Sequence, residues 1–366
     1  MATSDYGAGN PLAVKVWAKA LFREALKQTQ VSNFMGEDTN SLVYVKNDLN
    51  KSAGDKITYG LRTQLSGAGV VGDGTLEGNE EALALYSDSI VIDQLRNAVR
   101  SAGEMSDQRV PFTVREEAML GLADWFAEKL DRSFFNQIAG NTAATTLQET
   151  GQQATVDATS LAGNTRIIYA TNKAAGTIST TTASLSASVT ECTFQLQDID
   201  RLLTVAKTAT PAIRPFMVDG KPKYAVFAHP DQLYNLVTDN ATTRITWFDT
   251  MRSRIQGGDI NMNPIFTGAL GEYKGALLYE STRIPFTPGA GAANVRRAVL
   301  CGAQAVCFAT GQRDQGTKMK WVEEKFDYEN QLGVSAALIF GLKKTIFNSR
   351  DFATVVLETS TIGAQP

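Results

Sequence analysis

The sequence predicts an α+β protein that combines one long helix, a projecting hairpin and several buried strands. An apolar stripe between Thr113 and Ala139 indicates the helix. Two segments of alternating apolar and polar residues, on either side of a glycine-rich connection, indicate the hairpin. Short apolar runs in the second half of the chain indicate the strands, and together these observations predict a fold with both helices and sheets.

The chain begins with an amphipathic segment. Asn10 is suited to cap a helix and Pro11 to begin it. Val14, Trp17 and Leu21 then recur on one face. Such a helix either lies on the core of its own domain or forms an arm that docks on a neighbouring subunit, and the pattern leaves both interpretations open.

A hairpin is predicted between residues 55 and 96. Apolar residues alternate with polar ones over residues 57–61 and again over 83–92, which is the period of a half-buried strand. The connection between them includes "SGAGVVGDG" at residues 66–74. A two-stranded arm cannot bury both of its faces, so we expect it to pack on something outside itself.

The same connection contains the spacing Gly67-x-Gly69-x-x-Gly72 of a dinucleotide-binding fingerprint. That fingerprint requires a helix to begin at once, but Asp73 and Gly74 follow, which favour a turn. We therefore interpret the glycines as a flexible tip that permits positive φ. A nucleotide-dependent α/β enzyme is the alternative that this motif suggests.

The segment from Thr113 to Ala139 is the clearest helix of the sequence. Thr113 and Glu116 have the spacing of a capping box, and Gly140 supplies a stop. The helix is long enough to serve as a spine. Its apolar stripe consists of Met119, Leu122, Phe126, Leu130 and Phe134.

Residues 141–193 differ in composition from the rest of the chain, because Thr, Ser, Ala and Gly dominate them. Few large apolar residues are available there to build a core. We predict an insertion of loops and short strands, which forms either an exposed β-rich surface patch or a tolerated long loop.

The remainder of the chain has a mixed α/β pattern. The stretch "KYAVFAHPDQLYNLV" predicts a buried strand that runs into a helix, with His229 as its cap and Pro230 as its first residue. The runs "YKGALLYESTRIP" and "AVLCGAQAVCFATG" predict further strands, or a strand and a helix. The end of the chain is strand-rich, with alternation around Trp321, Phe326 and Tyr328.

Reactive side chains are few. The chain of 366 residues has one histidine, His229, and three cysteines whose spacing is not that of a zinc site: Cys192, Cys301 and Cys307. In "GQRDQGTK" the lysine does not directly follow the glycine, as a phosphate loop would require. We therefore expect no catalytic residue, metal site or cofactor, and we interpret the cysteines as small buried groups.

The charged residues are predicted to be structural. Two acidic groups are interpreted as solvated faces: Glu77, Glu80 and Glu81, and the pair Glu323 and Glu324. Basic residues are too scattered for a nucleic-acid groove and are predicted to pair with carboxylates of the same or a neighbouring chain: Arg244, Arg252 and Arg254, Arg296 and Arg297, and Lys343 and Lys344. A formal charge of -3 provides no global attraction for DNA or an anionic membrane.

The composition is that of an ordinary folding protein, with 43% hydrophobic and 20% charged residues. Lys15, Lys19 and Arg23 interrupt the apolar runs near the start, so we expect no signal peptide, and we expect no membrane span. The prediction is a soluble protein made in a cytoplasm. An extracellular surface-layer or adhesin subunit, which the Thr/Ser-rich segment suggests, is disfavoured on this ground.

The order of these parts resembles the major capsid proteins of tailed bacteriophages, which have the Johnson fold, and more narrowly a podovirus-type family of them. The resemblance covers most of residues 50–350. It is carried by "GDKITYGLRTQLSGAGVVGDGTLEGNEEAL", "DQLRNAVRSAGEMSDQRVPF", "ADWFAEKLDRSFFNQIAG", "FAHPDQLYNL", "NPIFTGALGEYKGALLYESTRIP" and "FDYENQLGVSAALIFGLKKTIFNSRDF".

The resemblance implies a division into an N-terminal arm, an E-loop hairpin that lies over an adjacent subunit, a peripheral-domain spine helix, an axial domain and closing peripheral-domain strands. In chain order these are 1–50, 51–108, 109–140, 194–311 and 312–366, and the insertion 141–193 falls in a position from which it would decorate a capsid face. The implied inter-subunit contacts are Gly67, Gly69, Gly72 and Gly74 at the hairpin tip, and Trp17 and Leu21 in the arm.

The implied function is non-enzymatic: self-assembly, as hexamers and pentamers, into the icosahedral shell that encloses packaged double-stranded DNA. The protein would be assembled in the bacterial cytoplasm and reside in the virion capsid. No acidic helical scaffolding region is visible in the sequence, so a separate scaffolding protein is an expected partner. A portal and a decoration protein are further partners that the resemblance allows, DNA would be contacted weakly and non-specifically, and no membrane is involved.

Overall fold

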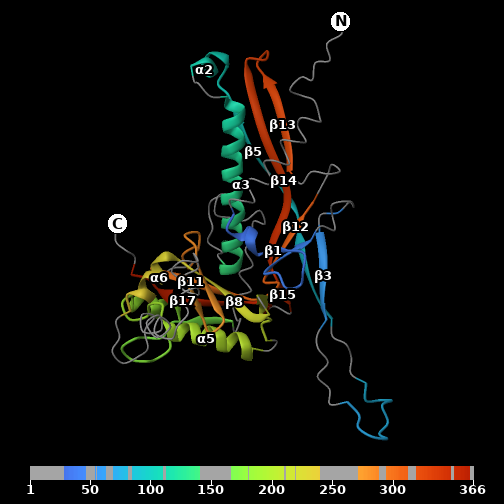
Figure 1. Ribbon diagram of the computed structural model, residues 1–366, viewed down its shortest axis with the longest axis vertical. Coiled ribbons are helices and arrows are strands. Elements are labelled where there is room, and N and C mark those ends of the chain that lie inside the picture. The colour runs from blue at the N-terminus through green and yellow to red at the C-terminus, as the bar shows by residue number, and fades with distance from the viewer. Residues whose placement is uncertain are drawn as a thin grey trace.

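The computed structural model describes three arrangements of secondary structure, which we name by their shape (Figure 1). The elongated part is the long helix α3 with a six-stranded sheet, the broad part is a seven-stranded sheet with three helices, and the hairpin is the pair β3–β4. The described residues are 29–46, 54, 56–62, 69–80, 85–109, 113–140, 166–179, 181–209, 212–218, 220–239, 271–287, 294–311, 319–347 and 350–362.

Some of the predicted features lie outside the described residues. These are the N-terminal helix with Trp17 and Leu21, the first glycine of the fingerprint, Gly67, and the first part of the predicted insertion, 141–165.

Helix α3 runs from Val114 to Ala139 and forms the axis of the elongated part. The predicted stripe is confirmed, because its side chains are buried or packed against the core. Gly140 ends the helix in the left-handed conformation with φ of 62°, as predicted. The predicted capping box is wrong: the Thr113 side chain makes no cap hydrogen bond. Both Thr113 and Glu116 are exposed, so water competes for those bonds.

The six-stranded sheet is built around β14, which has antiparallel neighbours. Along the first half of β14 these neighbours are β13 and β5, and β12 follows along its second half. The short strands β1 and β2 extend the sheet beyond β12 through parallel pairs. The bounds are β1 Met35–Gly36, β2 Val43–Lys46, β5 Asp93–Arg100, β12 Val306–Thr310, β13 Met319–Phe326 and β14 Gln331–Lys344.

The predicted alternation at the end of the chain is confirmed in part. Trp321 is buried on β13. Tyr328 is not in the strand, because β13 ends at Phe326. Asp327, Tyr328 and Glu329 all have positive φ, of 52°, 52° and 71°, and this left-handed turn reverses the chain into β14 and leaves Tyr328 exposed.

The broad part is a mixed sheet in the order β6-β17-β11-β8-β10-β9, with β7 paired to β8. Its strands are β6 Ile167–Tyr169, β7 Phe216–Val218, β8 Lys221–Ala228, β9 Gly271–Tyr273, β10 Ala276–Glu280, β11 Val295–Cys301 and β17 Thr354–Ser360. Its helices are α4 Thr182–Ala187, α5 Leu196–Thr208 and α6 Pro230–Val237. The remaining short elements are η1 Val31–Phe34, α2 Glu104–Gln108, β15 Ile346–Phe347 and β16 Arg350–Asp351.

The strands predicted here are confirmed. β8 continues directly into α6, with His229 as the cap and Pro230 as the first helical residue. The run "AVLCGAQAVCFATG" forms two strands that belong to different sheets, β11 in the broad part and β12 in the elongated part. The chain therefore crosses between the two parts at residues 302–305.

Residues 166–193 contain the short strand β6, as predicted, and also the helix α4, which was not predicted. Strand β6 pairs in parallel with β17 over Val356↔Ile167 to Glu358↔Tyr169, and Ile168 is buried. Thr171 then donates two hydrogen bonds, from its backbone amide and its hydroxyl, to Asp198 at the start of α5. The composition did not indicate that β6 belongs to the seven-stranded sheet, because its partner β17 is distant in sequence.

The apolar core is continuous between the two parts. Phe134 and Phe135 of α3 pack edge-on against Phe227 of β8, at ring-centroid distances of 5.9 and 5.6 Å. Phe34 of η1 approaches the same ring at 5.5 Å. The spine helix is thus fixed to the broad part by an aromatic cluster.

Two glycines provide a matched test of the packing. We expect Gly302→Ala to destabilise the chain by about 1–3 kcal/mol, because overpacking forces the backbone to move. A Cβ at Gly302 would lie 2.5 Å from both the Arg214 carbonyl oxygen and Ile213 Cγ2. Gly121→Ala, on the exposed face of α3 with nothing within 4 Å, should instead stabilise it by about 0.5–1 kcal/mol. Urea unfolding measures the free energy of unfolding of the two variants. A change in the same direction for both would contradict this packing.

Candidate assembly surfaces

The hairpin is the most prominent projection of the molecule (Figure 1). Strands β3 (Lys56–Arg62) and β4 (Leu85–Val91) pair antiparallel from Lys56↔Val91 to Arg62↔Leu85, which confirms the predicted hairpin. Its predicted extent is wrong at the C-terminal end, because β5 joins β14 in the six-stranded sheet. β5 forms eight consecutive residue pairs with β14, from Gly333↔Arg100 to Phe340↔Asp93, so its hydrogen bonds hold it to the body.

The glycine-rich connection has no helix over the described residues 69–80. Gly69 and Gly72 both have φ of 67°, as predicted for a tip that needs positive φ. Gly74 serves a different purpose, since a Cβ there would lie 2.6 Å from Val70 Cγ1. Without a helix after the glycines, the described loop lacks the helix N-terminus on which a nucleotide pyrophosphate would bind.

The outer half of the hairpin exposes large apolar side chains. Val71 in the loop is 91% exposed, Leu76 is 61% exposed, and Leu85 at the start of β4 is 69% exposed. The sequence pattern indicated the glycines of this loop and not these apolar residues. Val71 could have been found, because it is an apolar residue between glycines in "GVVGDG". The outer half of the hairpin thus leaves apolar surface in contact with solvent in the single subunit.

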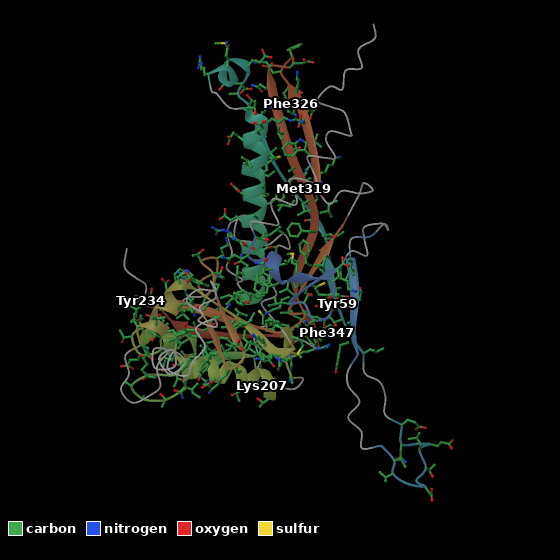
Figure 2. All side chains as sticks on the ribbon, viewed as in Figure 1. Tyr59, Lys207, Tyr234, Met319, Phe326 and Phe347 are labelled. Atoms are coloured by element: carbon green, nitrogen blue, oxygen red, sulfur yellow. The ribbon has the colours of Figure 1, made fainter. Side chains whose placement is uncertain are left out.

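The inner half of the hairpin is buried against the elongated part. Ile57 and Ile90 form a small apolar cluster with Cys307 and Ala309 of β12. Tyr59 points to Phe347 at the root of the hairpin (Figure 2), and their rings meet edge-on at 6.0 Å. The hairpin therefore has a fixed root and an uncovered outer half.

A buried ionic contact joins the elongated and broad parts. Arg297 of β11 donates from Nε to Glu358 at 3.0 Å, and from Nη1 to the carbonyl oxygens of Ala139 and Gly140 at 2.8 and 2.9 Å. These carbonyls are at the negative end of the α3 dipole, where a cation is favoured. Thr182 donates to the other oxygen of Glu358 at 2.6 Å. One guanidinium thus ties the end of the spine helix to the seven-stranded sheet.

A second buried carboxylate holds the chain at the start of the described residues. Asp131 of α3 accepts hydrogen bonds from the backbone amides of Gln30 and Val31, at 3.1 and 3.3 Å, and from Arg283 of the broad part. Burial raises the pKa of Asp131, and the hydrogen bonds and Arg283 oppose that rise. Asp131 therefore fixes Gln30 and Val31 against α3.

The basic residues have carboxylate partners within the chain, as predicted. Arg296 pairs with Asp231, Arg297 with Glu358, Lys343 with Asp88 and Lys344 with Asp351, at distances between 2.7 and 3.1 Å. Arg244, Arg252 and Arg254 lie outside the described residues.

The solvated interpretation of the glutamates is wrong for one of them. The side chain of Glu323 is 4% exposed and accepts hydrogen bonds from Arg115 and Trp321, each at 2.7 Å. The buried indole of Trp321 needs a hydrogen-bond acceptor, and Glu323 supplies it. Glu77, Glu80 and Glu324 are exposed, as interpreted, and Glu81 lies outside the described residues.

The reactive residues are used structurally. All three cysteines are free and buried, as predicted. Within the described part of the chain, no group of three or more His, Cys, Asp or Glu side chains is arranged to hold a metal ion. The described residues also contain no helix that is both long and apolar enough to cross a bilayer.

His229 gives a pH-dependent prediction. Its Nδ1 accepts a hydrogen bond from the Asp231 amide at 3.2 Å, and burial together with Arg296 lowers the pKa of His229 to about 4, against the attraction of Asp231. The folded chain thus favours neutral imidazole, so this contribution to stability is complete above pH 6.5 and is lost as the pH falls toward 4. NMR titration of the one histidine should show the lowered pKa. His229→Asn keeps a cap and should flatten this part of the stability profile, whereas a normal pKa would contradict the geometry.

The sequence matches the family described as phage capsid protein over residues 5–362. The chain belongs to this family. The major capsid protein of Pseudomonas phage KPP25 is 30% identical over 367 residues, which cover 93% of each chain. This capsid protein is also similar to the solved capsid of Ralstonia phage GP4, with 28% identity, a TM-score of 0.70 and 91% of both chains covered. The capsid asymmetric unit of cyanophage Pam1 is 25% identical, with a TM-score of 0.71 and coverage of 92% of this chain and 93% of the other.

These similarities confirm the resemblance to capsid proteins of tailed phages and establish the mixed α+β fold as one found in phage capsids. The protein is a major capsid protein, and its copies form the shell of the virion. The surfaces described above are therefore surfaces of a capsid subunit.

Proposed function

We propose that this capsid protein has the Johnson-type division of labour and that the hairpin is its main inter-subunit arm. In this proposal the hairpin with loop 69–80 is the E-loop, which lies over an adjacent subunit. The elongated part is the peripheral domain with α3 as its spine. The broad part is the axial domain at the centre of hexamers and pentamers, and it includes β17 from the segment first assigned to the peripheral domain. Trp17 and Leu21 contribute to an N-terminal arm.

The observation that supports this role is the contrast between the two halves of the hairpin. Its root is buried against β12 and β15, whereas Val71, Leu76 and Leu85 are exposed. In a shell each subunit repeats the same contact by symmetry. An arm that buries a few apolar side chains on one neighbour therefore stabilises the shell at every subunit. Gly69 and Gly72 let the loop adapt to that neighbour.

A closed shell also requires partners other than the capsid protein itself. We propose that it is icosahedral, that it encloses double-stranded DNA and that it is assembled in the host cytoplasm with a separate scaffolding protein and a portal. The formal charge of -3 fits weak, non-specific contact with DNA. The subunit acts as a structural protein and carries out no chemical reaction.

Negative-stain electron microscopy of the purified chain, combined with sedimentation, tests self-assembly directly. We expect capsomers or closed shells, with the monomer as a minor species. A chain that remains monomeric at high concentration, and that instead binds NAD(H) in a manner sensitive to Gly69→Ala, would overturn the proposal.

A further inference from the structure

One of the two chain connections between the hairpin and the body is a single residue. β4 ends at Val91 in the hairpin and β5 begins at Asp93 in the six-stranded sheet, so only Ile92 separates two strands of different sheets. Ile92 packs against the apolar cluster at the hairpin root. It also lies over Gly311, where a Cβ would be 2.6 Å from Ile92 Cδ1. The chain therefore passes from the hairpin to the six-stranded sheet at Ile92, the position where a change in hairpin direction would be absorbed.

Asp88 lies on β4, four residues before Ile92, and holds the hairpin to the body. Its Oδ2 accepts hydrogen bonds from the Tyr59 hydroxyl at 2.9 Å and the Ile346 amide at 3.1 Å, and its Oδ1 accepts from Lys343 Nζ at 2.7 Å. The donors come from β3, β15 and β14, so one carboxylate joins both strands of the hairpin to two strands of the body. Lys343 adds a hydrogen bond to the Ser89 carbonyl at 3.2 Å.

The apolar and polar contacts at the root have different consequences. The cluster around Ile57 and Ile90 keeps the root in place, but apolar packing is non-directional and tolerates rotation. The hydrogen bonds of Asp88 are directional and charge-assisted, and the side chains of Asp88 and Lys343 are only 8% and 20% exposed, so water competes weakly with them.

We propose that Asp88, together with Lys343, is a latch that sets the direction in which the hairpin leaves the body about Ile92. Formation of the latch presents the outer half of the hairpin in one orientation. Release of the latch lets the hairpin turn about its root while the rest of the fold is unchanged. The consequence for assembly rests on the proposed role of the hairpin as the inter-subunit arm, whereas the latch itself does not.

Double electron–electron resonance tests the latch in the full chain, by measuring the distance between one spin label on the hairpin and one on the body. Spin labels at Ser87→Cys on β4 and Lys320→Cys on β13 attach to exposed positions, while the three native cysteines are buried. Labelled chain is diluted with unlabelled chain so that distances within one subunit dominate. We expect a narrow distribution for the parent chain and a broad one for Asp88→Asn and for Lys343→Met, with amide exchange in β3 and β4 faster by about tenfold and exchange in α3 unchanged.

Asp93→Asn is the matched control, because Asp93 is exposed and, among the described residues, its side chain accepts from the neighbouring Gln94 amide alone. It should leave both measurements unchanged. Lys343→Met provides a second test of the latch if Asp88→Asn folds poorly, since it keeps the carboxylate and its bonds to Tyr59 and Ile346. A distance distribution as narrow as that of the parent chain in the folded latch variants would overturn the latch.

Assembly of the same variants separates the two proposals. If the latch and the arm are both correct, the variants should give fewer closed shells and more open or irregular particles than Asp93→Asn. Broadened distances with normal shells would leave the latch in place and overturn the role of the hairpin in assembly.

Discussion

Arg297→Met is expected to lower the free energy of unfolding by about 3–5 kcal/mol, because removing one partner of a buried ion pair leaves the other charge uncompensated. Glu358 would remain buried, with its side chain 3% exposed, and would keep only Thr182 among the donors described here. The carbonyls of Ala139 and Gly140 would lose their donor as well. We therefore expect the junction between the elongated and broad parts to weaken together with overall stability.

Urea unfolding of unassembled subunits measures this effect. Lys274→Met is a suitable control, because it breaks an ion pair with Asp200 whose lysine side chain is 60% exposed, and it should cost less than about 1 kcal/mol. The double variant Arg297→Met/Glu358→Gln should recover much of the loss, since no charge is then left unpaired. An Arg297→Met variant as stable as the Lys274 control would show that the guanidinium does not hold the junction.

Deletion of residues 66–78 is expected to abolish closed shells while leaving the subunit folded. The described part of this segment, 69–78, makes only local hydrogen bonds such as Gly78 N to Glu80, and most of it is exposed. Removing such a loop costs little of the core. The deletion also removes Val71 and Leu76, the apolar side chains that we propose to lie on the neighbouring subunit.

Circular dichroism and negative-stain electron microscopy give the two readouts for this deletion. A glycine–serine replacement of the same length is the control, because it keeps the reach of the loop and removes its side chains. We expect it to assemble poorly too, which would assign the effect to Val71 and Leu76. Loss of the folded circular dichroism signal, or a normal yield of shells, would contradict the expectation.

Local sequence patterns were sufficient for the elements that depend on local chemistry. The apolar stripe along α3 follows from helical periodicity, and the helix ends at Gly140 because glycine readily adopts the left-handed conformation. Pro230 fixes the start of α6. The hairpin could be predicted because two segments of alternating apolar and polar residues flank a glycine-rich connection. The features that the sequence did not indicate depend on distant partners. They are the pairing of β6 with β17 and the burial of Glu323 beside Arg115 and Trp321.

The same contrast between local and long-range chemistry holds for the two ends of the hairpin. The position of the hairpin tip could be predicted, since its glycines are adjacent in sequence. The root could not, because Asp88 and Lys343 are 255 residues apart and neither belongs to a recognisable motif. Long-range pairs of this kind arise from the tertiary fold, and no periodicity in one sequence reports them.

A cryo-electron microscopy map of the assembled shell tests the central claim most directly, because it places the hairpin relative to its neighbour. We predict that the hairpin and loop 69–80 lie over an adjacent subunit, with Val71 and Leu76 covered by it. A map in which the loop folds back on its own subunit, or projects uncovered into solvent, would contradict the role proposed for the hairpin.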